Sequence, residues 1–496
     1  MRLYELCQDF EYQISKEENP EITEIVYDSR KIVPGCLFVC LCGAVSDGHV
    51  YAAEAEQKGA AAIVAMKDVD TKGIIPVVRT KDTRRALAMI SAAHFGHPAK
   101  ELLTIGITGT KGKTTTSYFI QRVLLEAGMK TGYVGTVEID TGAEKIPAVN
   151  TTPESYLLQK YMREMVNNGC KAVVMEVSSQ GLKMERTSGF VFDIGAFTNL
   201  EPDHIGPNEH KDFDEYAECK AKLFRACRFG ILNKDDVNYQ RMLNKHTCDI
   251  MTIGVNSDAD LRAEDIDYHH GEGKMMVSYR TKGVFETEVE ILVPGLFSVY
   301  NSLMAVAVCN HIGIEAGVIR KALRNVQVRG RMENIDISDR FSLLIDYAHN
   351  AMSLKSLLTT LKDCGPKRIV CLFGCGGNRS KDRRFEMGEI SSTYADLTIV
   401  TSDNPRFEKP EDIIQDIITG VKRASGQYVT IPDRKEAIRY AITNSKEGDL
   451  IVLAGKGHED YQEICGVKHP MDERVLIREI IEEMTDEERV ACGLRM

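Results

Sequence analysis

The chain has 496 residues, and 62 Lys and Arg face 73 Asp and Glu, which gives a formal net charge of −11. At roughly 100–200 residues per domain, this length predicts about three domains, each with its own core. The acidic balance excludes a broad nucleic-acid surface, because phosphate backbones require clustered Lys and Arg, but it permits a local site for a phosphate-bearing small molecule. Neither a run of 18 apolar residues nor a signal peptide is evident, since MRLYELCQDFEYQ turns polar early, so we expect no membrane insertion.

The 14 cysteines are scattered singly, and they do not form the paired C-x-x-C spacing of a zinc site. We therefore expect reduced thiols in a cytoplasmic enzyme. Cys371 and Cys375 lie in apolar or glycine-rich runs, which favours small core residues over metal ligands.

In chain order, residues 22–79 alternate short apolar strands with helical stretches. VYDSRKIVPGCLFVCL predicts a strand, a Pro-Gly turn and a second strand, and HVYAAEAEQKGAAAIVA predicts a helix followed by a strand. A helix is expected over residues 83–95, and GHPAKE is then a hinge. We assign residues 1–100 to a first domain.

From residue 102 the pattern changes to longer alternation of strands and helices. LLTIGITG, KAVVMEVSS and VFDIGAFTN are nearly continuous apolar runs, as buried parallel strands require. TTTSYFIQRVLLEAG predicts a helix that stops at Gly128. Residues 101–328 form the predicted central domain.

A second α/β series begins near Arg329, with the strands FSLLIDYAH, RIVCLFGCGG, LTIVTSDNP and DLIVLAGKG. Each of these strands ends in polar or glycine residues at its carboxyl end, where ligands collect in open α/β sheets. The predicted fold class is α/β in three domains: an N-terminal domain, a central P-loop-type ATPase domain with a parallel sheet, and a Rossmann-like C-terminal domain over residues 329–496.

Residues 108–114, TGTKGKT, join a predicted strand to a predicted helix. Glycines let backbone N–H groups turn toward a polyphosphate, and the helix N-terminus adds the positive end of its dipole. Lys113 is expected to reach the β- and γ-phosphates, and the Thr114 hydroxyl to hold Mg²⁺. Ile107 stands where the usual spacing places a first glycine, but the strand–loop–helix context still predicts binding of a nucleoside triphosphate.

Two classes of nucleotide protein fit such a loop. A GTPase-like switch is suggested by Asp203-His-Ile-Gly206 and by the NKDD at residues 233–236, but the first lies far beyond the loop and the C-terminal third stays unexplained. A ligase that forms an acyl phosphate needs Mg²⁺ ligands, cations and an amine site. Glu176 ends one predicted strand and the Asp203-His204 pair follows the next at the same sheet edge, which favours the ligase.

A series of motifs supports the ligase interpretation. In order they are GITGTKGKTTT, NTTPES, MEVSSQGL, FTNLEPDH, EYAECKAKLF, GRME, DYAHN, FGCGGNR, TSDNPR and GKGHEDYQ. The set resembles the Mur ligase family, and DSR at residues 28–30 with Asp47-Gly48-His49 extends the resemblance to the N-terminus. The resemblance implies an ATP- and Mg²⁺-dependent ligase that extends the peptide of a UDP-N-acetylmuramoyl substrate in peptidoglycan synthesis. It also implies a monomer that binds small molecules only.

The resemblance also implies roles for individual residues. Those for the UDP-muramoyl peptide are Ser29, Arg30 and His49 at the nucleotide, with Asn150, Thr151, Thr152, Ser178 and Arg186 at the peptide. Those for ATP are Gly109, Thr110, Lys111, Gly112, Lys113, Thr114, Thr115, Asn301, Arg331 and Asp346. Those for catalysis are Lys113, Glu176, His204 and Lys220, of which Glu176, His204 and a carbamate on Lys220 hold metal together with Thr114.

The incoming amino acid is predicted from the C-terminal motifs. Asp403-Asn404-Pro405-Arg406 resembles the signature of members that add meso-diaminopimelate rather than L-lysine. Diaminopimelate carries a distal carboxylate, which suits the planar fork of Arg406, while Arg379 would hold another carboxylate and Gly455 and Glu459 would take the distal ammonium. An L-lysine-adding enzyme and one with another acceptor remain alternatives, since Gln180, Met184, residues 203–210 and Arg383-Arg384-Phe385 depart from the family pattern.

Overall fold

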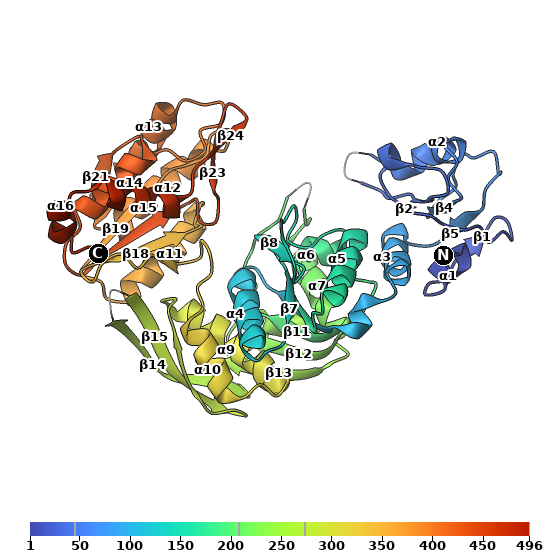
Figure 1. Ribbon diagram of the computed structural model, residues 1–496, viewed down its shortest axis with the longest axis horizontal. Helices are drawn as coiled ribbons and strands as arrows, with labels where there is room; N and C mark the ends of the chain where they lie inside the picture. The colour runs from blue at the N-terminus through green and yellow to red at the C-terminus, as the bar shows by residue number, and fades with distance from the viewer. Residues whose placement is uncertain (44–45, 207–208, 272–273, 496) are drawn as a thin grey trace. The chain divides into compact units, whose positions relative to one another are not determined.

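The computed structural model describes residues 1–43, 46–206, 209–271 and 274–495 (Figure 1). The chain forms two compact units, each described by itself below. One comprises Met1–Arg262 with Leu303–Ile319, and the other comprises Ala263–Ser302 with Arg320–Met496.

The N-terminal part of the first unit is a five-stranded sheet in the order β1-β5-β4-β3-β2, parallel except for β1. The strands are β1 (Gln13–Ile14), β2 (Ile25–Val26), β3 (Leu37–Val39), β4 (Ala62–Ala65) and β5 (Val77–Arg79). The helices are α1 (Leu3–Cys7), α2 (Ala52–Gln57) and α3 (Thr83–His94). Asp82 starts α3 by accepting from the backbone N–H groups of Arg84 and Arg85, a typical N-cap.

Two details of this region add to the predicted pattern. A short 3-10 helix, Ser29–Lys31, lies between β2 and β3, where the sequence predicted only a Pro-Gly turn. The expected hinge contains a further 3-10 helix, Pro98–Glu101, preceded by His97 with a positive φ of 54°.

The central sheet has β6 between β10 and β11, in the order β13-β12-β11-β6-β10-β7-β8-β9. The strands are β6 (Leu103–Thr108), β7 (Thr131–Val134), β8 (Glu138–Asp140), β9 (Lys145–Pro147), β10 (Ala172–Glu176), β11 (Phe192–Phe197), β12 (Cys227–Asn233) and β13 (Asp249–Gly254). The pairs from β13 to β7 are parallel, and the pairs β7–β8 and β8–β9 are antiparallel. The predicted buried strands are confirmed at β6, β10 and β11.

Helices follow the central strands. They are α4 (Lys113–Glu126), α5 (Ser155–Asn167), α6 (Ser179–Lys183), α7 (Phe213–Ala221) and α8 (Tyr239–Met242), with a 3-10 helix at Lys222–Arg225. The later helices α9 (Leu296–His311) and α10 (Ala316–Arg324) each contain residues of both units. The predicted stop of α4 is confirmed, since Gly128 has a φ of 80°, which suits glycine.

The second unit contains a six-stranded sheet in the order β17-β18-β22-β19-β20-β21, parallel except for β17. Its strands are β17 (Glu333–Asn334), β18 (Ser342–Asp346), β19 (Arg368–Phe373), β20 (Leu397–Val400), β21 (Gln427–Thr430) and β22 (Asp449–Ala454). Its other strands are β14 (Leu261–Gly271), β15 (Lys274–Gly283), β16 (Glu288–Ile291) and the antiparallel pair β23 (Tyr461–Ile464) and β24 (Val467–Pro470). The helices are α11 (Ala351–Asp363), α12 (Lys381–Tyr394), α13 (Pro410–Val421), α14 (Arg434–Thr443), α15 (Glu473–Glu483) and α16 (Asp486–Ala491).

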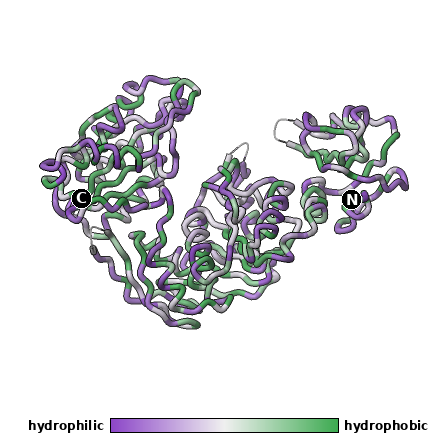
Figure 2. The backbone as a smooth tube through the Cα atoms, in the orientation of Figure 1, coloured by the Kyte–Doolittle hydropathy of each residue, from purple (hydrophilic) through white to green (hydrophobic). Residues whose placement is uncertain are grey.

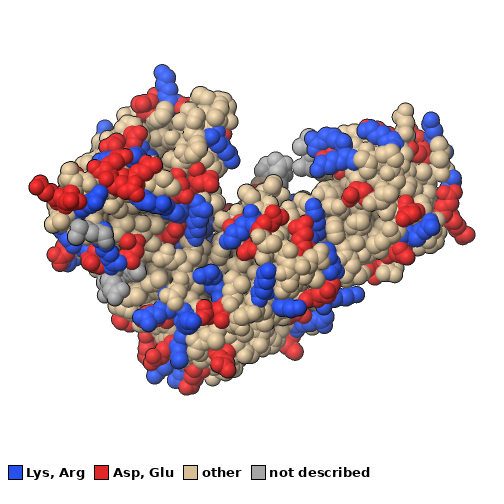
Figure 3. All heavy atoms as spheres, in the orientation of Figure 1, with Lys and Arg blue, Asp and Glu red and all other residues tan. Residues whose placement is uncertain are grey.

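Apolar side chains of these strands and helices form the cores, and Figure 2 shows hydrophobic residues along the strands of each sheet. Cys371 and Cys375 are buried, which confirms their assignment to the core, and all 14 cysteines are free. Within the described residues, no helix has the length and apolar character to cross a membrane. On the face drawn in Figure 3, positive and negative side chains are interspersed rather than gathered by sign.

Candidate active site

The phosphate loop connects β6 to α4, as predicted, and two of its glycines are required by its backbone. Gly109 has a φ of 152°, and a Cβ there would stand 1.9 Å from Thr198 Oγ1. Gly112, the N-cap of α4, has a φ of 83°. The loop can therefore bring backbone N–H groups close to an anion at the N-terminus of a fourteen-residue helix.

Lys113 lies against the loop that precedes it. Its ammonium donates to the carbonyl oxygens of Gly109 and Thr110, at 2.9 Å each. These bonds hold the ammonium group against the phosphate loop. A cation so placed can pair with phosphate oxygens.

Glu176, the last residue of β10, is the hub beneath the loop and is only 1% exposed. Its carboxylate accepts from Thr114 Oγ1 at 3.0 Å, from Tyr133 Oη at 2.7 Å, and from the Thr136 N–H at 2.9 Å and Oγ1 at 3.0 Å. Burial and then the charge of Glu176 raise the pKa of Tyr133 well above its usual value, so this phenol stays a donor. The Thr114 hydroxyl and the Glu176 carboxylate together offer only oxygen ligands, which suits Mg²⁺.

Lys220 lies on α7 and is 1% exposed. Its Nζ donates to the Gly109 carbonyl at 2.7 Å and lies 4.6 Å from the centre of the Tyr216 ring. Burial, reinforced by the nearby charge of Lys113, lowers the pKa of Lys220 well below its ordinary value. The structure thus brings Lys220 to the phosphate loop as an amine that loses its proton readily.

His204 is more exposed than these groups. Its side chain is 53% exposed, its Nδ1 lies 2.9 Å from Glu209 Oε1, and its ring centre lies 6.3 Å from that of Tyr216. Tyr216 in turn contacts Thr110 through its hydroxyl at 3.0 Å, so His204 borders the same loop. Pro207 and Asn208, two of the residues that depart from the family pattern, lie outside the described residues.

A buried histidine lies nearby at position 210. His210 is completely buried, and its Nε2 lies 2.9 Å from Ser179 Oγ. Burial lowers the pKa of His210, which favours its neutral form.

Two residues that follow β11, and that sequence reasoning did not single out, hold the phosphate loop in place. Asn199 accepts from the Lys111 N–H at 2.9 Å through Oδ1 and donates to the Lys111 carbonyl at 3.0 Å through Nδ2. Thr198 Oγ1 donates to the same carbonyl at 2.6 Å. Their position just after a buried strand, in the motif FTNLEPDH, is the feature of the sequence that could have identified them.

The residues that suggested guanine recognition serve the backbone of the unit instead. Asp235 accepts from the N–H groups of Val255 at 2.6 Å and Asn256 at 2.8 Å. Asn233 donates to the Thr198 carbonyl at 2.9 Å. These contacts join loops at the ends of β11, β12 and β13.

The residues expected at the muramoyl peptide lie next to Glu176. Thr152 Oγ1 donates to the Glu176 carbonyl at 2.9 Å, and its separation from Ser178 Oγ is 3.2 Å. Arg186 Nη1 donates to the Thr152 carbonyl at 2.8 Å, while its Nε lies 3.6 Å from Glu154. Thr151 Oγ1 contacts Thr136 Oγ1 at 3.1 Å, and Asn150 is exposed.

The residues expected at the UDP moiety differ in exposure. Arg30 is 87% exposed and forms a two-bond pair with Asp28, at 2.9 and 2.8 Å, while Ser29 begins the 3-10 helix. His49 is buried: its Nδ1 lies 2.6 Å from Asp47 Oδ1, and its Nε2 accepts from the Met66 N–H at 3.1 Å. The His49 ring thus links Asp47 to the backbone of Met66.

The C-terminal motifs meet in the second unit at the carboxyl ends of β20 and β22. Asn404 Nδ2 donates to Glu459 Oε2 at 3.0 Å, which joins the DNPR and GKGHE segments. Arg406, with a φ of 51°, donates through Nε to Glu463 at 3.0 Å and through Nη1 to the Gly377 carbonyl at 2.8 Å. Arg379 is exposed and has no hydrogen bond or ion pair within the described residues.

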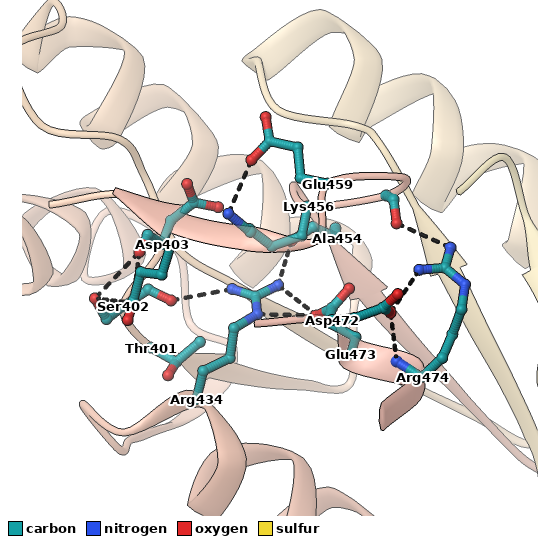
Figure 4. A network of polar contacts seen from close by, with 12 residues as sticks. Thr401, Ser402, Asp403, Arg434, Ala454, Lys456, Glu459, Asp472, Glu473 and Arg474 are labelled. Carbon is teal, nitrogen blue, oxygen red and sulfur yellow. Dashed lines mark hydrogen bonds and ion pairs between the residues drawn. The ribbon is translucent and has the colours of Figure 1, made fainter. Parts of the chain in front are cut away.

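A buried ion pair supports the strand ends on which those motifs begin (Figure 4). Arg434 and Glu473 are 4% and 1% exposed, and Arg434 Nη2 lies 2.8 Å from Glu473 Oε1. The guanidinium also donates to the carbonyls of Ser402 and Ala454, at 3.1 Å each.

The remaining ATP candidates also belong to the second unit. Asp346, at the end of β18, accepts from the N–H groups of Met332 at 2.9 Å and Ala348 at 2.8 Å, and burial raises its pKa. The Arg331 guanidinium lies 5.0 Å from the centre of the Tyr347 ring, and Asn301 on α9 is 4% exposed.

A glycine loop at the carboxyl edge of a parallel sheet, with a lysine, a threonine and a buried carboxylate around it, defines a nucleotide-dependent enzyme of the P-loop type. Three parts of the chain match known families: residues 21–100 the Mur ligase family, catalytic domain; residues 107–309 the Mur ligase middle domain; and residues 330–457 the Mur ligase, glutamate ligase domain.

Individual proteins match over nearly the whole chain. The UDP-N-acetylmuramoyl-L-alanyl-D-glutamate--2,6-diaminopimelate ligase of Caldanaerobacter subterraneus subsp. tengcongensis is 40% identical over 484 residues, or 97% of this chain and 99% of that protein. The protein of the same name from Clostridioides difficile is 38% identical over 491 residues, or 98% and 100%. A solved structure of a ligase of that name has a TM-score of 0.73 at 28% identity, covering 97% of this chain and 99% of the other.

The chain therefore belongs to the Mur ligase family, which confirms the resemblance and the α/β fold class. As a member it is an ATP-dependent ligase that forms an amide bond. This membership favours the ligase interpretation over the GTPase-like switch.

Proposed function

We propose that the protein adds meso-diaminopimelate to UDP-N-acetylmuramoyl-L-alanyl-D-glutamate in peptidoglycan synthesis, with ATP as the phosphoryl donor. The observation that carries this proposal is the meeting of the phosphate loop, Glu176, Lys220 and the Thr152–Arg186 contact at one edge of the central sheet. A phosphoryl donor and a carboxylate acceptor can therefore lie side by side there. The names of the relatives given above support the same substrates.

In the first step the γ-phosphoryl group passes from ATP to the D-glutamate carboxylate and gives an acyl phosphate and ADP. The loop N–H groups and Lys113 hold the triphosphate and stabilise charge on the transferring group. Thr114 and Glu176, with His204, would hold Mg²⁺, which when bound neutralises phosphate charge. Glu176 is oriented for this by Tyr133 and Thr136.

Lys220 would act as a carbamate. Its lowered pKa leaves a neutral amine, whose lone pair can attack CO₂ to form an N–C bond, with one proton lost to solvent. The product is an anion at the phosphate loop, and its oxygens would help to hold a second Mg²⁺. Carboxylation of Lys220 is part of the proposal.

The other substrates would contact the remaining motifs. Exposed Arg30, with Ser29 and the His49 loop, would hold UDP, and Asn150, Thr151, Thr152, Ser178 and Arg186 the peptide. Asn301, Arg331 and Asp346 would contact ATP, and Arg379, residues 403–406, Gly455 and Glu459 the amino acid. The amine then attacks the acyl phosphate, forms the amide and releases phosphate.

One assay tests the proposal. The protein is mixed with ATP, Mg²⁺ and the UDP-dipeptide, and phosphate release is compared with meso-diaminopimelate, with L-lysine and with no amino acid. We expect release that depends on meso-diaminopimelate, together with a tripeptide product of the matching mass. Turnover with L-lysine alone would refute the assigned amino acid, and release without any amino acid would refute the ligase step.

The three-domain boundaries near residues 100 and 328 and the monomeric state remain predictions. Limited proteolysis near both boundaries and light scattering of the purified protein test them.

A further inference from the structure

Lys456 is a buried cation to which the proposed reaction gives no role. It follows Gly455 at the end of β22 and is 0% exposed. Its Nζ donates to Glu459 Oε2 at 2.8 Å, to Asn404 Oδ1 at 2.9 Å and to the Tyr461 carbonyl (Figure 4 shows the bond to Glu459). All three ammonium protons can therefore be satisfied, as a buried charge requires.

The partners of Lys456 come from the two segments proposed to bind the amino acid. Asn404 belongs to DNPR and Glu459 to GKGHE, and the two side chains also bond to each other at 3.0 Å. Asn404 Oδ1 further accepts from the Glu463 N–H at 2.9 Å. A change at Lys456 would thus reach both segments through direct contacts.

The lysine also balances the charge of Glu459. Its ammonium and Asn404 Nδ2 both contact Oε2, so this oxygen is fixed by two donors. The side chain of Glu459 is 17% exposed, so the carboxylate keeps an accessible face. A ligand ammonium arriving there would meet a carboxylate already paired with a cation, and would gain less than from an unpaired one.

The charge of Arg406 is likewise balanced by a side chain of the protein. It is paired with Glu463 at 3.0 Å, and both side chains are about one quarter exposed, at 23% and 25%. Two side chains proposed to contact the distal end of the amino acid are therefore each held by an opposite charge of the protein itself. Such a subsite offers little net charge and a fixed separation of positive and negative groups.

We propose that Lys456 is a positioning residue that sets the amino-acid preference. It holds Glu459 and Asn404 together and balances the charge of Glu459. The subsite then favours a distal group that is itself zwitterionic, as in meso-diaminopimelate, over the bare ammonium of L-lysine. This inference rests on the proposed function.

The test is Lys456→Met, which keeps the length of the side chain and removes its charge. The full-length variant is assayed for phosphate release with meso-diaminopimelate and with L-lysine, and kcat/KM is compared for the two. Where turnover of L-lysine is too slow, its inhibition constant against meso-diaminopimelate replaces it. Lys435→Met is the control, since Lys435 is likewise a lysine paired with carboxylates, those of Glu479 and Glu483, which belong to neither of these segments.

We expect kcat/KM for meso-diaminopimelate to fall and the preference over L-lysine to narrow by about tenfold, while KM for ATP stays within about twofold. Glu459→Gln combined with Lys456→Met should change the preference no more than Glu459→Gln alone, because Lys456 acts through Glu459. Equal losses for both amino acids would overturn the proposal, since a lysine needed only for folding lowers both alike. If Lys456→Met does not fold, Lys456→Gln is judged by the same ratio.

The wild-type protein in the same assay tests the proposed function separately. Absence of amino-acid-dependent release there contradicts the proposed function. A normal wild-type preference that is unchanged in Lys456→Met contradicts only the role of Lys456.

Discussion

Replacing Glu473 by alanine should destabilise the C-terminal sheet more than an exposed ion pair could. The change leaves the guanidinium of Arg434, 4% exposed, without its carboxylate. Breaking a buried pair from one side costs about 3–5 kcal/mol, because an uncompensated charge remains. Since Glu473 Oε2 has no hydrogen-bond partner within the described residues, the pair is not fully bidentate, and we expect the lower end, about 3 kcal/mol.

The matched control is the adjacent residue on α14. Lys435 pairs with Glu479 at 2.8 Å and Glu483 at 2.7 Å, but these carboxylates are 46% and 49% exposed. Exposed pairs contribute about 0–1 kcal/mol, so Lys435→Met should be nearly neutral. Glu473→Ala removes one buried ion pair and Lys435→Met removes two exposed ones, so the difference in expected cost tests the effect of burial.

Hydrogen exchange followed by mass spectrometry measures the effect where it arises. In peptides that cover β20 and β22, a loss of about 3 kcal/mol corresponds to amide exchange roughly a hundredfold faster. Peptides of the central sheet serve as an internal reference. Exchange in Glu473→Ala that matches Lys435→Met would refute the reasoning that burial makes this pair essential to the strand ends.

Three further predictions concern the phosphate loop. Lys220→Ala should lose most activity and regain part of it with added short carboxylates, and the absence of rescue in phosphate release would count against the carbamate. Without bicarbonate, Lys220 binds fewer protons in the folded protein than in the unfolded chain, because its pKa lies well below the ordinary 10.5. The free energy of unfolding, measured by urea titration, should therefore rise with pH until the pH reaches 10.5. In Lys220→Met this contribution to the pH dependence should be absent. Asn199→Ala removes both bonds to the Lys111 backbone and should raise KM for ATP about tenfold, whereas Asn168→Ala, which removes one bond to the Thr141 carbonyl, should not; equal values would exclude a role in holding the loop.

The sequence predicted the strands of both parallel sheets well, for a physical reason. Strands buried on both faces are continuous apolar runs, and polar residues begin where each strand ends, as at Thr108, Glu176 and Asp346. The phosphate loop could also be predicted from the sequence, because its backbone has positive φ at Gly109 and Gly112 and such positions favour glycine.

Contacts between segments far apart in the sequence could not be predicted in this way. The clamp of Asn199 on Lys111 joins residues 88 positions apart, and nothing in either segment alone shows it. The resemblance assigned His49 to the UDP moiety, but the sequence did not show that its ring is buried against Asp47 and Met66. Arg384, which departs from the family pattern, proved to be 1% exposed and paired with Glu408 and Asp416.

The partners of the cations separate two kinds of positive charge in this acidic protein. Arg434, Arg384 and Lys456 are buried against carboxylates, so their charges are cancelled within the fold. Lys113 donates to the Gly109 and Thr110 carbonyls, which hold its ammonium group at the phosphate loop. Arg379 is exposed and makes no ion pair in the described part of the chain. A protein of net charge −11 can thus bind anionic substrates, because the attraction depends on where individual cations lie and not on the total charge.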